Sequence, residues 1–190
     1  MIKHPIARLL RPVRAGIGKI AWHHSAIAGA PELITVTSTA FAEGAAIPQR
    51  HAGAGVGANI SPALYWSGVP AAAVELVLIV EDPDVPLPRP IVHGLFSGIA
   101  ADCGGIPEGA LALEYSARPA FQIGVGSFKR RGYAGPRPIP GHGPHRYIFQ
   151  LFALDAPSGL GGEATLAETL AAIDGHVLGR GKLTGTYERD

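Results

Sequence analysis

The sequence predicts a mainly β protein, an antiparallel sandwich with peripheral helices. Short apolar runs rich in β-branched residues are separated by turn-forming segments that contain most of the 26 glycines and 17 prolines. These strand-like runs follow one another without the regular alternation with helices that a doubly wound fold requires. With 190 residues, of which 47% are hydrophobic and 16% charged, the chain can bury one sizeable core.

Five segments have the composition of strands. The run from Val74 to Val80 is almost continuously apolar, which is typical of a central strand with both faces covered. A β-branched run follows Pro31, and two further runs leave the loops described below. The predicted strands are residues 33–37, 74–80, 92–99, 147–154 and 183–187.

One helix is predicted near the C-terminus. Thr165 with Glu168 three residues later forms a capping-box pattern, which marks the start of a helix. The apolar residues that then fall on one helical face are Leu166, Leu170, Ile173 and Val177. Gly179 and Gly181 are expected to end this helix.

The first 24 residues form a basic leader that contains five Lys or Arg and no acidic residue. Its apolar residues recur at steps of three and four, so a helix would place them on one face, although Pro5 and Pro12 limit its regularity. Two interpretations stay open: an interfacial helix on anionic lipid, and an arm packed on the domain or on a second subunit. We divide the chain into a basic amphipathic extension, residues 1–30, and a domain, residues 31–190.

Two sequence features bear on the location of the protein. No apolar stretch of ten residues occurs in the leader, which argues against a transmembrane helix and against a secretory signal. Cys103 is the only cysteine, so no intrachain disulfide can form and a reducing compartment is mildly favoured. We expect a cytoplasmic protein, with peripheral membrane contact through the leader as the alternative.

Two Pro-rich loops contain the residues with distinctive chemistry. One runs from Glu81 to His93 and the other from Gly135 to Tyr147. Each loop meets an apolar strand-like run, so its polar side chains lie where a loop joins a rigid scaffold. In the first loop the prolines restrict the backbone and hold Asp82 and Asp84 with little freedom. This arrangement indicates a binding pocket.

The residue types in these loops suit a compact anion. His93, His145 and Tyr147 can donate hydrogen bonds, and Asp82 can fix a histidine tautomer or accept from a protonated phosphate. Each residue also has a plainer interpretation, because Asp-Pro-Asp can tie down its own loop and a single histidine is usually a core residue. Two such loops ending in histidine favour one shared pocket for a phosphomonoester or a zwitterion.

Taken together, these segments resemble the phosphatidylethanolamine-binding protein family, also called Raf kinase inhibitor-like proteins, and above all its bacterial members. The first family signature is similar to Asp82-Pro83-Asp84-Val85-Pro86 followed by His93. The other family signature is similar to Gly135-Pro136-x-Pro138 through Gly141-x-Gly143-x-His145-Arg146-Tyr147. Further similar segments lie at 59–66, 127–133, 175–178 and 185–188, and the resemblance covers roughly residues 32–189.

The resemblance implies both a fold and a site. The implied fold is a β-sandwich of two antiparallel sheets in a Greek-key arrangement, with a small anion pocket at one end. The residues that would line this pocket are Asp82, Pro86, His93, Pro138, His145 and Tyr147. The residues that would support its loops are Asp84, Gly135, Pro136 and Gly141.

Three classes of function stay open. The resemblance favours non-catalytic, regulatory binding of a phosphate-like anion or a phosphorylated head group. The second class is a kinase or protease inhibitor that acts by surface contact, and the third is a hydrolase that uses His93 or His145 with Asp82. No nucleophile elbow or metal-binding motif is evident in the sequence, so we predict no catalytic residues, no metal and no cofactor.

The expected partner is a small phosphorylated or anionic ligand, with a kinase, a protease or a second copy of the chain as further candidates. The run Lys129-Arg130-Arg131 is interpreted as a solvated loop, and with little positive charge elsewhere we expect no nucleic-acid binding. Arg137 belongs to the second loop, where it can contact a phosphate or stay solvated.

Overall fold

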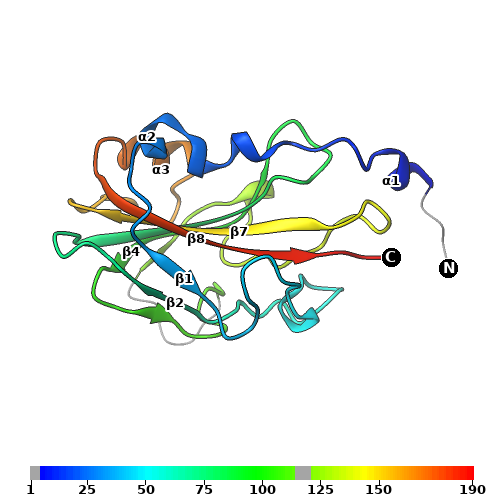
Figure 1. The fold of residues 1–190 in the computed structure, drawn as a ribbon, viewed down its shortest axis with the longest axis horizontal. Helices are drawn as coiled ribbons and strands as arrows, with labels where there is room; N and C mark the ends of the chain where they lie inside the picture. Colours follow the sequence, from blue (N-terminus) through cyan, green and yellow to red (C-terminus); the bar gives the residue numbers. More distant parts are fainter. Residues whose placement is uncertain (1–4, 114–120) are drawn as a thin grey trace.

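The structure is a computed structural model that describes residues 5–113 and 121–190, and within them it contains two antiparallel sheets (Figure 1). In strand order the larger sheet is β6 (Gln122–Ile123), β4 (Ile91–Ala100), β3 (Glu75–Asp82), β7 (His145–Leu154) and β8 (Val177–Tyr187). The smaller sheet is β1 (Thr35–Thr37), β2 (Leu64–Ser67) and β5 (Gly105–Ile106). The predicted mainly β, antiparallel fold class is confirmed.

The helices of this fold are short. They are α1 (Pro5–Leu9), α2 (Ser25–Ala28) and α3 (Leu166–Ala172), with 3-10 turns η1 (Ile17–Lys19), η2 (Ala21–His23), η3 (Gln49–His51) and η4 (Ser127–Lys129). In Figure 1, α2, α3 and the leader lie on one side of the larger sheet, and the smaller sheet lies on the other. The larger sheet is therefore the middle layer.

Strand β3 occupies the centre of the middle layer, as its apolar sequence predicted. All of its residues are buried, and it pairs with β4 on one side and β7 on the other. Leu78 and Val80 pack in the core between the two sheets, whereas Val77 and Ile79 pack against the leader and α3. Both faces of β3 are covered because alternate side chains point to opposite sides of a sheet.

Helix α3 begins as predicted but ends earlier. The capping box is present, with Thr165 and Glu168 each bonding the backbone N–H of the other. The helix ends at Ala172, because Gly175 takes a φ of 79° that turns the chain, and Val177 is the first residue of β8. The prediction that Val177 belongs to the helical face was therefore wrong.

Gly179 and Gly181 were also misassigned, since both lie inside β8 and do not end the helix. A side chain at position 181 would collide with the backbone carbonyl of Ile34, and one at position 179 would press on Pro70 and Leu33. These glycines therefore allow the segment before β1 to pack closely on β8.

The leader does not form one amphipathic helix. Helix α1 ends at Leu9, and turns follow from Leu10 through Pro12 to η1 and η2. Pro12 and Gly16 interrupt the helical pattern, because proline lacks an N–H and Gly16 has a φ of 104°. Ile2 and the side chain of Ile6, which contributed to the predicted stripe, lie outside the part that the structure describes.

Instead, the leader packs on the larger sheet, which matches the interpretation of an arm packed on the domain. The backbone N–H of Trp22 donates to Gln150 Oε1 (2.7 Å), and that of Ala21 donates to Glu81 Oε2 (2.7 Å). Burial raises the pKa of Glu81, although Ala21 and Gln150 donate hydrogen bonds to it. The Trp22 ring lies 4.2 Å from the Arg180 guanidinium carbon.

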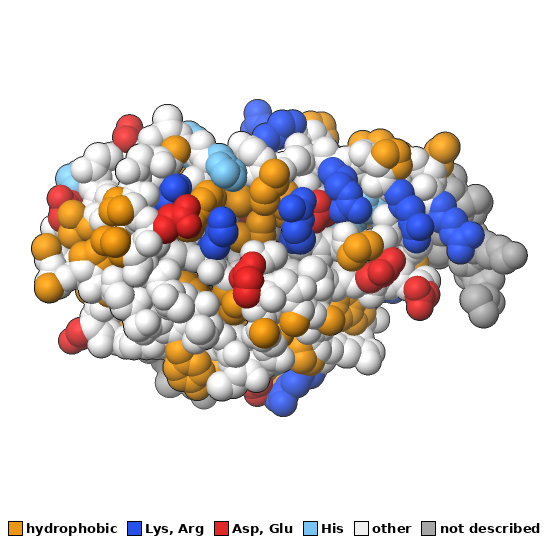
Figure 2. All heavy atoms as spheres, viewed as in Figure 1, with side chains coloured by type: hydrophobic (Ala, Val, Ile, Leu, Met, Phe, Trp, Pro, Cys, Tyr) orange, Lys and Arg blue, Asp and Glu red, His pale blue; other side chains and the backbone are white. Residues whose placement is uncertain are grey.

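Positive charge is prominent on the face along which the leader runs. Figure 2 shows a band of Lys and Arg side chains from the middle of this face to the end where the leader begins. Among the described residues, no helix is both long and apolar enough to cross a membrane.

Candidate anion-binding site

The two Pro-rich loops meet at one end of the larger sheet. Asp82 ends β3, while His93 lies near the start of β4 and His145 starts β7. Because these neighbouring strands are antiparallel, the end of β3 lies beside the starts of β4 and β7. Asp82, His93, His145 and Tyr147 therefore come together, and each is at most 9% exposed.

A β-bulge turns His93 toward this site. Val80 pairs with Gly94 and Glu81 pairs with Val92, so His93 is the extra residue between two successive pairs. An extra residue breaks the alternation of side chains along a strand and changes the direction in which they point. The His93 ring meets the Tyr147 ring edge to face, with 5.0 Å between ring centroids.

His93 and Tyr147 each hold an unpaired polar atom in a buried position. His93 Nδ1 lies 2.6 Å from the carbonyl oxygen of Ala134, which can only accept, so Nδ1 carries the hydrogen. His93 Nε2 and the Tyr147 hydroxyl have no hydrogen-bond partner among the described residues. Buried polar groups are normally paired, so two such atoms on contacting rings mark a place for a polar guest.

Burial also determines the charge of these two side chains. It lowers the pKa of His93, and the positive charge of Arg130 acts in the same direction, while Asp82 opposes the shift. Burial, reinforced by the negative charge of Asp82, raises the pKa of Tyr147 well above its usual value, and the nearby backbone of Arg137 opposes this shift. Neither Asp82 nor Arg137 meets the hydroxyl with the geometry of a hydrogen bond. Near neutral pH, His93 is therefore an uncharged ring and Tyr147 an O–H donor.

A line of hydrogen bonds connects Asp82 to the leader. Asp82 Oδ2 lies 2.7 Å from His145 Nδ1, and His145 Nε2 lies 2.8 Å from His142 Nδ1. His142 Nε2 in turn lies 2.9 Å from the carbonyl oxygen of Leu10. We call this chain the histidine relay. Because it uses both ring nitrogens of His145, that ring is already fully engaged by protein groups.

Asp84 braces the first loop through contacts with β7 and with the leader. Its carboxylate accepts from the backbone N–H of Arg146 (2.8 Å), from Arg146 Nε (2.8 Å) and from a second guanidinium nitrogen (2.7 Å). Arg14 of the leader adds a contact of 3.0 Å. Burial opposes ionisation, but these donors outweigh it and hold the pKa of Asp84 below its usual value.

The leader also fastens the second loop. Arg11 Nε donates to the Gly141 carbonyl (3.0 Å), and Arg14 donates to the Pro144 carbonyl (3.1 Å). The backbone N–H groups of Ala15 and Gly16 donate to Val85 and Pro83 of the first loop. The leader therefore binds both signature loops.

The glycine amides of the second loop are occupied within the protein. Gly135 N–H donates to Asn59 Oδ1 (2.8 Å), and Gly141 N–H donates to the carbonyl of Arg189 (2.8 Å). A side chain at position 135 would overlap the backbone of Ala52, so this glycine permits two loops to pack together. Pro136 is buried beside Gly135.

A cavity of about 240 Å³ opens beside the converging residues, and His93 is one of its walls. Its remaining walls come from the start of β4, from η4 and from the second loop: Ile91, Val92, Ser127, Phe128, Arg130, Ala134, Gly135 and Arg137. Asp82, His145 and Tyr147 lie outside this lining. Pro86 is half-buried and Pro138 buried, and neither lines the cavity.

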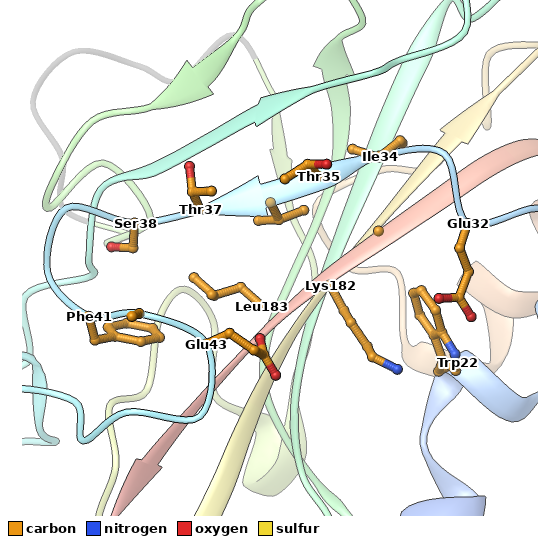
Figure 3. A pocket seen from close by; sticks show the side chains of 13 residues that line it. Trp22, Glu32, Ile34, Thr35, Thr37, Ser38, Phe41, Glu43, Lys182 and Leu183 are labelled. Carbon is orange, nitrogen blue, oxygen red and sulfur yellow. The ribbon is translucent and has the colours of Figure 1, made fainter.

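A larger hollow of about 610 Å³ lies between β1 and β8, away from these residues (Figure 3). Its charged groups are already engaged by the protein. Lys182 Nζ lies 4.3 Å from the centre of the Trp22 ring, and Glu43 Oε2 accepts from the backbone N–H of Thr184. We therefore place the candidate site at the smaller cavity, because His93, whose Nε2 is buried and unpaired among the described residues, forms one of its walls.

Three features of the site were missed from the sequence. His142 received no role, Arg14 was assigned only to a basic leader, and Arg130 was interpreted as solvated, although it lines the cavity. The His-x-x-His spacing of residues 142–145 was the one local signal for the relay. The contacts of Arg14 and Leu10 join residues far apart in sequence, so no local pattern encodes them.

The fold and the converging loops define a β-sandwich with a small polar cavity at one end of its central sheet. Residues 37–188 match the family described as phosphatidylethanolamine-binding protein. The chain belongs to this family.

Relatives of known sequence or structure agree with this assignment. A UPF0098 protein from Methanothermobacter thermautotrophicus is 39% identical over 150 residues, covering 79% of this chain and 95% of the relative. The crystal structure of CT736, a phosphatidylethanolamine-binding protein homologue from Chlamydia trachomatis, has a TM-score of 0.74 and 34% identity, covering 84% of this chain and 99% of that one. E. coli YbcL has a TM-score of 0.78 and 26% identity, covering 83% and 99%.

Proposed function

We propose that this protein binds a phosphate-like anion or a phosphorylated small molecule without transforming it, and that binding serves a regulatory role. The observation that supports this most directly is the pair of unpaired buried atoms, His93 Nε2 and the Tyr147 hydroxyl, beside Asp82. An anion with one proton can accept from the phenol and share its proton with the imidazole. Membership of the family supports a binding role in general terms.

A hydrolase gains less support from the geometry. A general base needs a free ring nitrogen within reach of a nucleophile or water. His145 is oriented by Asp82 as such a base would be, but its other nitrogen contacts His142 Nδ1 at 2.8 Å. His93 has a free Nε2, but its Nδ1 is held by the Ala134 carbonyl and not by Asp82, so neither histidine combines a free nitrogen with orientation by Asp82. We therefore expect no turnover of a phosphomonoester such as p-nitrophenyl phosphate. Turnover that His93→Ala or His145→Ala abolishes would favour the hydrolase instead.

Thermal unfolding with and without inorganic phosphate tests the proposal. Phosphate at ten times its Kd should add about 1.4 kcal/mol to the free energy of unfolding, because it binds only the native state. Tyr147→Phe removes only the unpaired hydroxyl and should abolish most of this increase. Tyr133→Phe is the matched control, because the Tyr133 hydroxyl is already paired: it donates to the His51 carbonyl (2.9 Å).

Two outcomes of this experiment would overturn the proposal. One is an unchanged melting temperature of the wild-type protein across a range of phosphate concentrations. The other is an equal phosphate response in wild type and Tyr147→Phe. The control should unfold at a lower temperature, because it loses a buried hydrogen bond, yet keep its phosphate response.

The partner and the location follow from the same proposal. A small phosphorylated or anionic ligand is the proposed partner, and a cytoplasmic location remains our prediction, to be checked by cell fractionation. A role as a kinase or protease inhibitor by surface contact differs in one measurable respect: inhibition would survive Tyr147→Phe, whereas phosphate binding would not.

A further inference from the structure

The mouth of the candidate cavity is positively charged. Arg130 and Arg137 both line it and both are exposed, so their guanidinium groups can move to meet a ligand. No carboxylate among the described residues forms an ion pair with either of them. Arg131, the next residue along, differs, because it contacts Glu163 at 3.0 Å and the carbonyl of Ile123. Two positive charges therefore line the cavity, and no carboxylate of the described residues neutralises either of them.

The turn that presents Arg130 is rigidly built and strained. Phe128 and Lys129 have φ values of 59° and 57°, a left-handed conformation that residues other than glycine rarely adopt. Ser127 Oγ accepts from the Val92 N–H next to His93 (2.9 Å), and Arg130 bonds back to Gly126 and Ser127 through its backbone. Strain held in place by surrounding bonds is frequent at binding sites.

The same turn supplies an apolar wall. The side chain of Phe128 is 69% exposed although it is aromatic, and it borders the cavity together with His93. The Arg130 guanidinium lies 6.0 Å from the centre of its ring. Beside the charged mouth, this wall suits an uncharged organic substituent better than an ammonium group, which the two arginines would repel.

The cavity volume limits the size of that substituent. At about 240 Å³ it is below the usual range for pockets that hold drug-sized ligands. A phosphate group with a substituent of a few atoms fits this volume. Phosphomonoesters bring up to two negative charges and diesters only one, so two arginines favour monoesters.

We propose that Arg130 and Arg137 make this site select a doubly charged phosphomonoester with a small, uncharged substituent over a zwitterionic head group or a phosphodiester. This inference rests on the proposed anion binding at the same site. Arg130 and Arg137 are its specificity-determining residues, and Phe128 contacts the substituent.

Titration calorimetry with three ligands tests this selectivity on the full-length protein. Ethyl phosphate and O-phosphoethanolamine differ in their substituent by one ammonium group, and dimethyl phosphate carries a single negative charge. We expect ethyl phosphate to bind about tenfold more tightly than either of the others, since one charge-assisted contact is worth about this much.

Variants assign the selectivity to the arginines. Arg130→Gln and Arg137→Gln should each weaken ethyl phosphate binding about tenfold and bring its affinity close to that of O-phosphoethanolamine. Lys129→Gln is the control, because it removes one positive charge from the same turn at a residue that does not line the cavity. Phe128→Asn removes the apolar wall with a residue that tolerates the left-handed backbone, and should weaken ethyl phosphate but not inorganic phosphate.

The outcomes separate this inference from the proposed function. If no phosphate compound binds the wild-type protein, the proposed function itself is wrong. If ethyl phosphate binds but O-phosphoethanolamine binds equally well, or if Arg130→Gln and Arg137→Gln behave like Lys129→Gln, the selectivity is wrong while anion binding stands.

Discussion

At the scale of single residues, the site combines buried groups that are paired with buried groups that are not. Asp82 and His145 are fully engaged, whereas His93 Nε2 and the Tyr147 hydroxyl lack partners among the described residues. Leaving a buried polar atom unpaired costs about 1–3 kcal/mol. The folded protein is therefore destabilised locally by these two atoms, and a ligand that forms hydrogen bonds with them would remove this destabilisation.

The state of His93 predicts how anion binding depends on pH. Its Nδ1 hydrogen is committed to the Ala134 carbonyl, so Nε2 presents a lone pair when the ring is neutral. A phosphate oxygen can approach this nitrogen only with a proton between them. A phosphomonoester above its second pKa carries no proton of its own, so its complex holds one proton more than free neutral His93 and the free ligand, and raising the pH must weaken binding.

We expect the apparent affinity for ethyl phosphate to fall about tenfold per pH unit above the second pKa of the ligand, which is about 6. Titration calorimetry at pH 6.5, 7.5 and 8.5, each in two buffers of different ionisation enthalpy, measures both the affinity and the proton uptake. An affinity that stays constant over this range, with no proton taken up, would contradict the assigned state of His93.

Local sequence identified some of these residues and not others. Asp82, His93, His145 and Tyr147 could be predicted to lie together because each adjoins a Pro-rich loop where that loop joins a strand. Their role in binding stays a prediction. His142 and Arg14 could not be assigned, because their partners, Leu10 and Asp84, are distant in sequence and meet them only in the folded chain.

At the scale of elements, strand β4 depends on a bulge and a glycine placed side by side. Gly94 follows the extra residue His93, and a methyl group at position 94 would lie 2.6 Å from the Phe96 ring and 3.7 Å from Val80. The missing side chain therefore faces the core between the sheets. The absence of a side chain at Gly94 leaves room for the Phe96 ring next to the bulge.

Gly94→Ala should destabilise the protein by about 1–3 kcal/mol, because the added methyl overpacks a buried ring that has little room to move. Urea unfolding measures the change in the free energy of unfolding. Gly104→Ala is a suitable control, since a methyl group there meets no atom within 4 Å. Equal stabilities of the two variants would show that the core beside the bulge is loosely packed.

Element types were predicted better than element ends. The apolar run 74–80 and the capping box at Thr165 each gave the correct element, because burial on both faces and a cap are local signals. The end of α3 was predicted at the wrong residue because glycine can either turn the chain or make room for a neighbouring segment. Gly175 turns the chain, whereas Gly179 and Gly181 make room for a neighbouring segment, and sequence alone does not separate these uses.

At the scale of the whole molecule, the leader is a structural layer. Ile20, Trp22 and Ile27 are buried against Val77, Ile79 and Phe152 of the larger sheet, in a second core with α3. The match to the family begins only at residue 37, so this layer precedes the matched region. The division of the chain at residue 30 remains a prediction, but residues 5–30 complete the packing of the domain.

Removing residues 1–30 should therefore expose an apolar face of the larger sheet and cause aggregation or a large fall in melting temperature. Trp22→Ala, in the full-length chain, should cost about 3–5 kcal/mol in the free energy of unfolding. Leu9→Ser is the control, because that side chain is 78% exposed. A shortened chain that stays monomeric and melts like the complete one would show that the leader contributes no packing energy.

The histidine relay has a consequence for the electrical balance of the site. Its three contacts need three hydrogens on two imidazole rings, so making all of them at once gives the pair one positive charge, which the ionised Asp82 neutralises. Burial, together with the nearby charge of His145, lowers the pKa of His142, so this third hydrogen departs at a lower pH than an ordinary histidine would lose it. The unit then carries a net negative charge, and an approaching anion is repelled by the same residues that had met it as a neutral group.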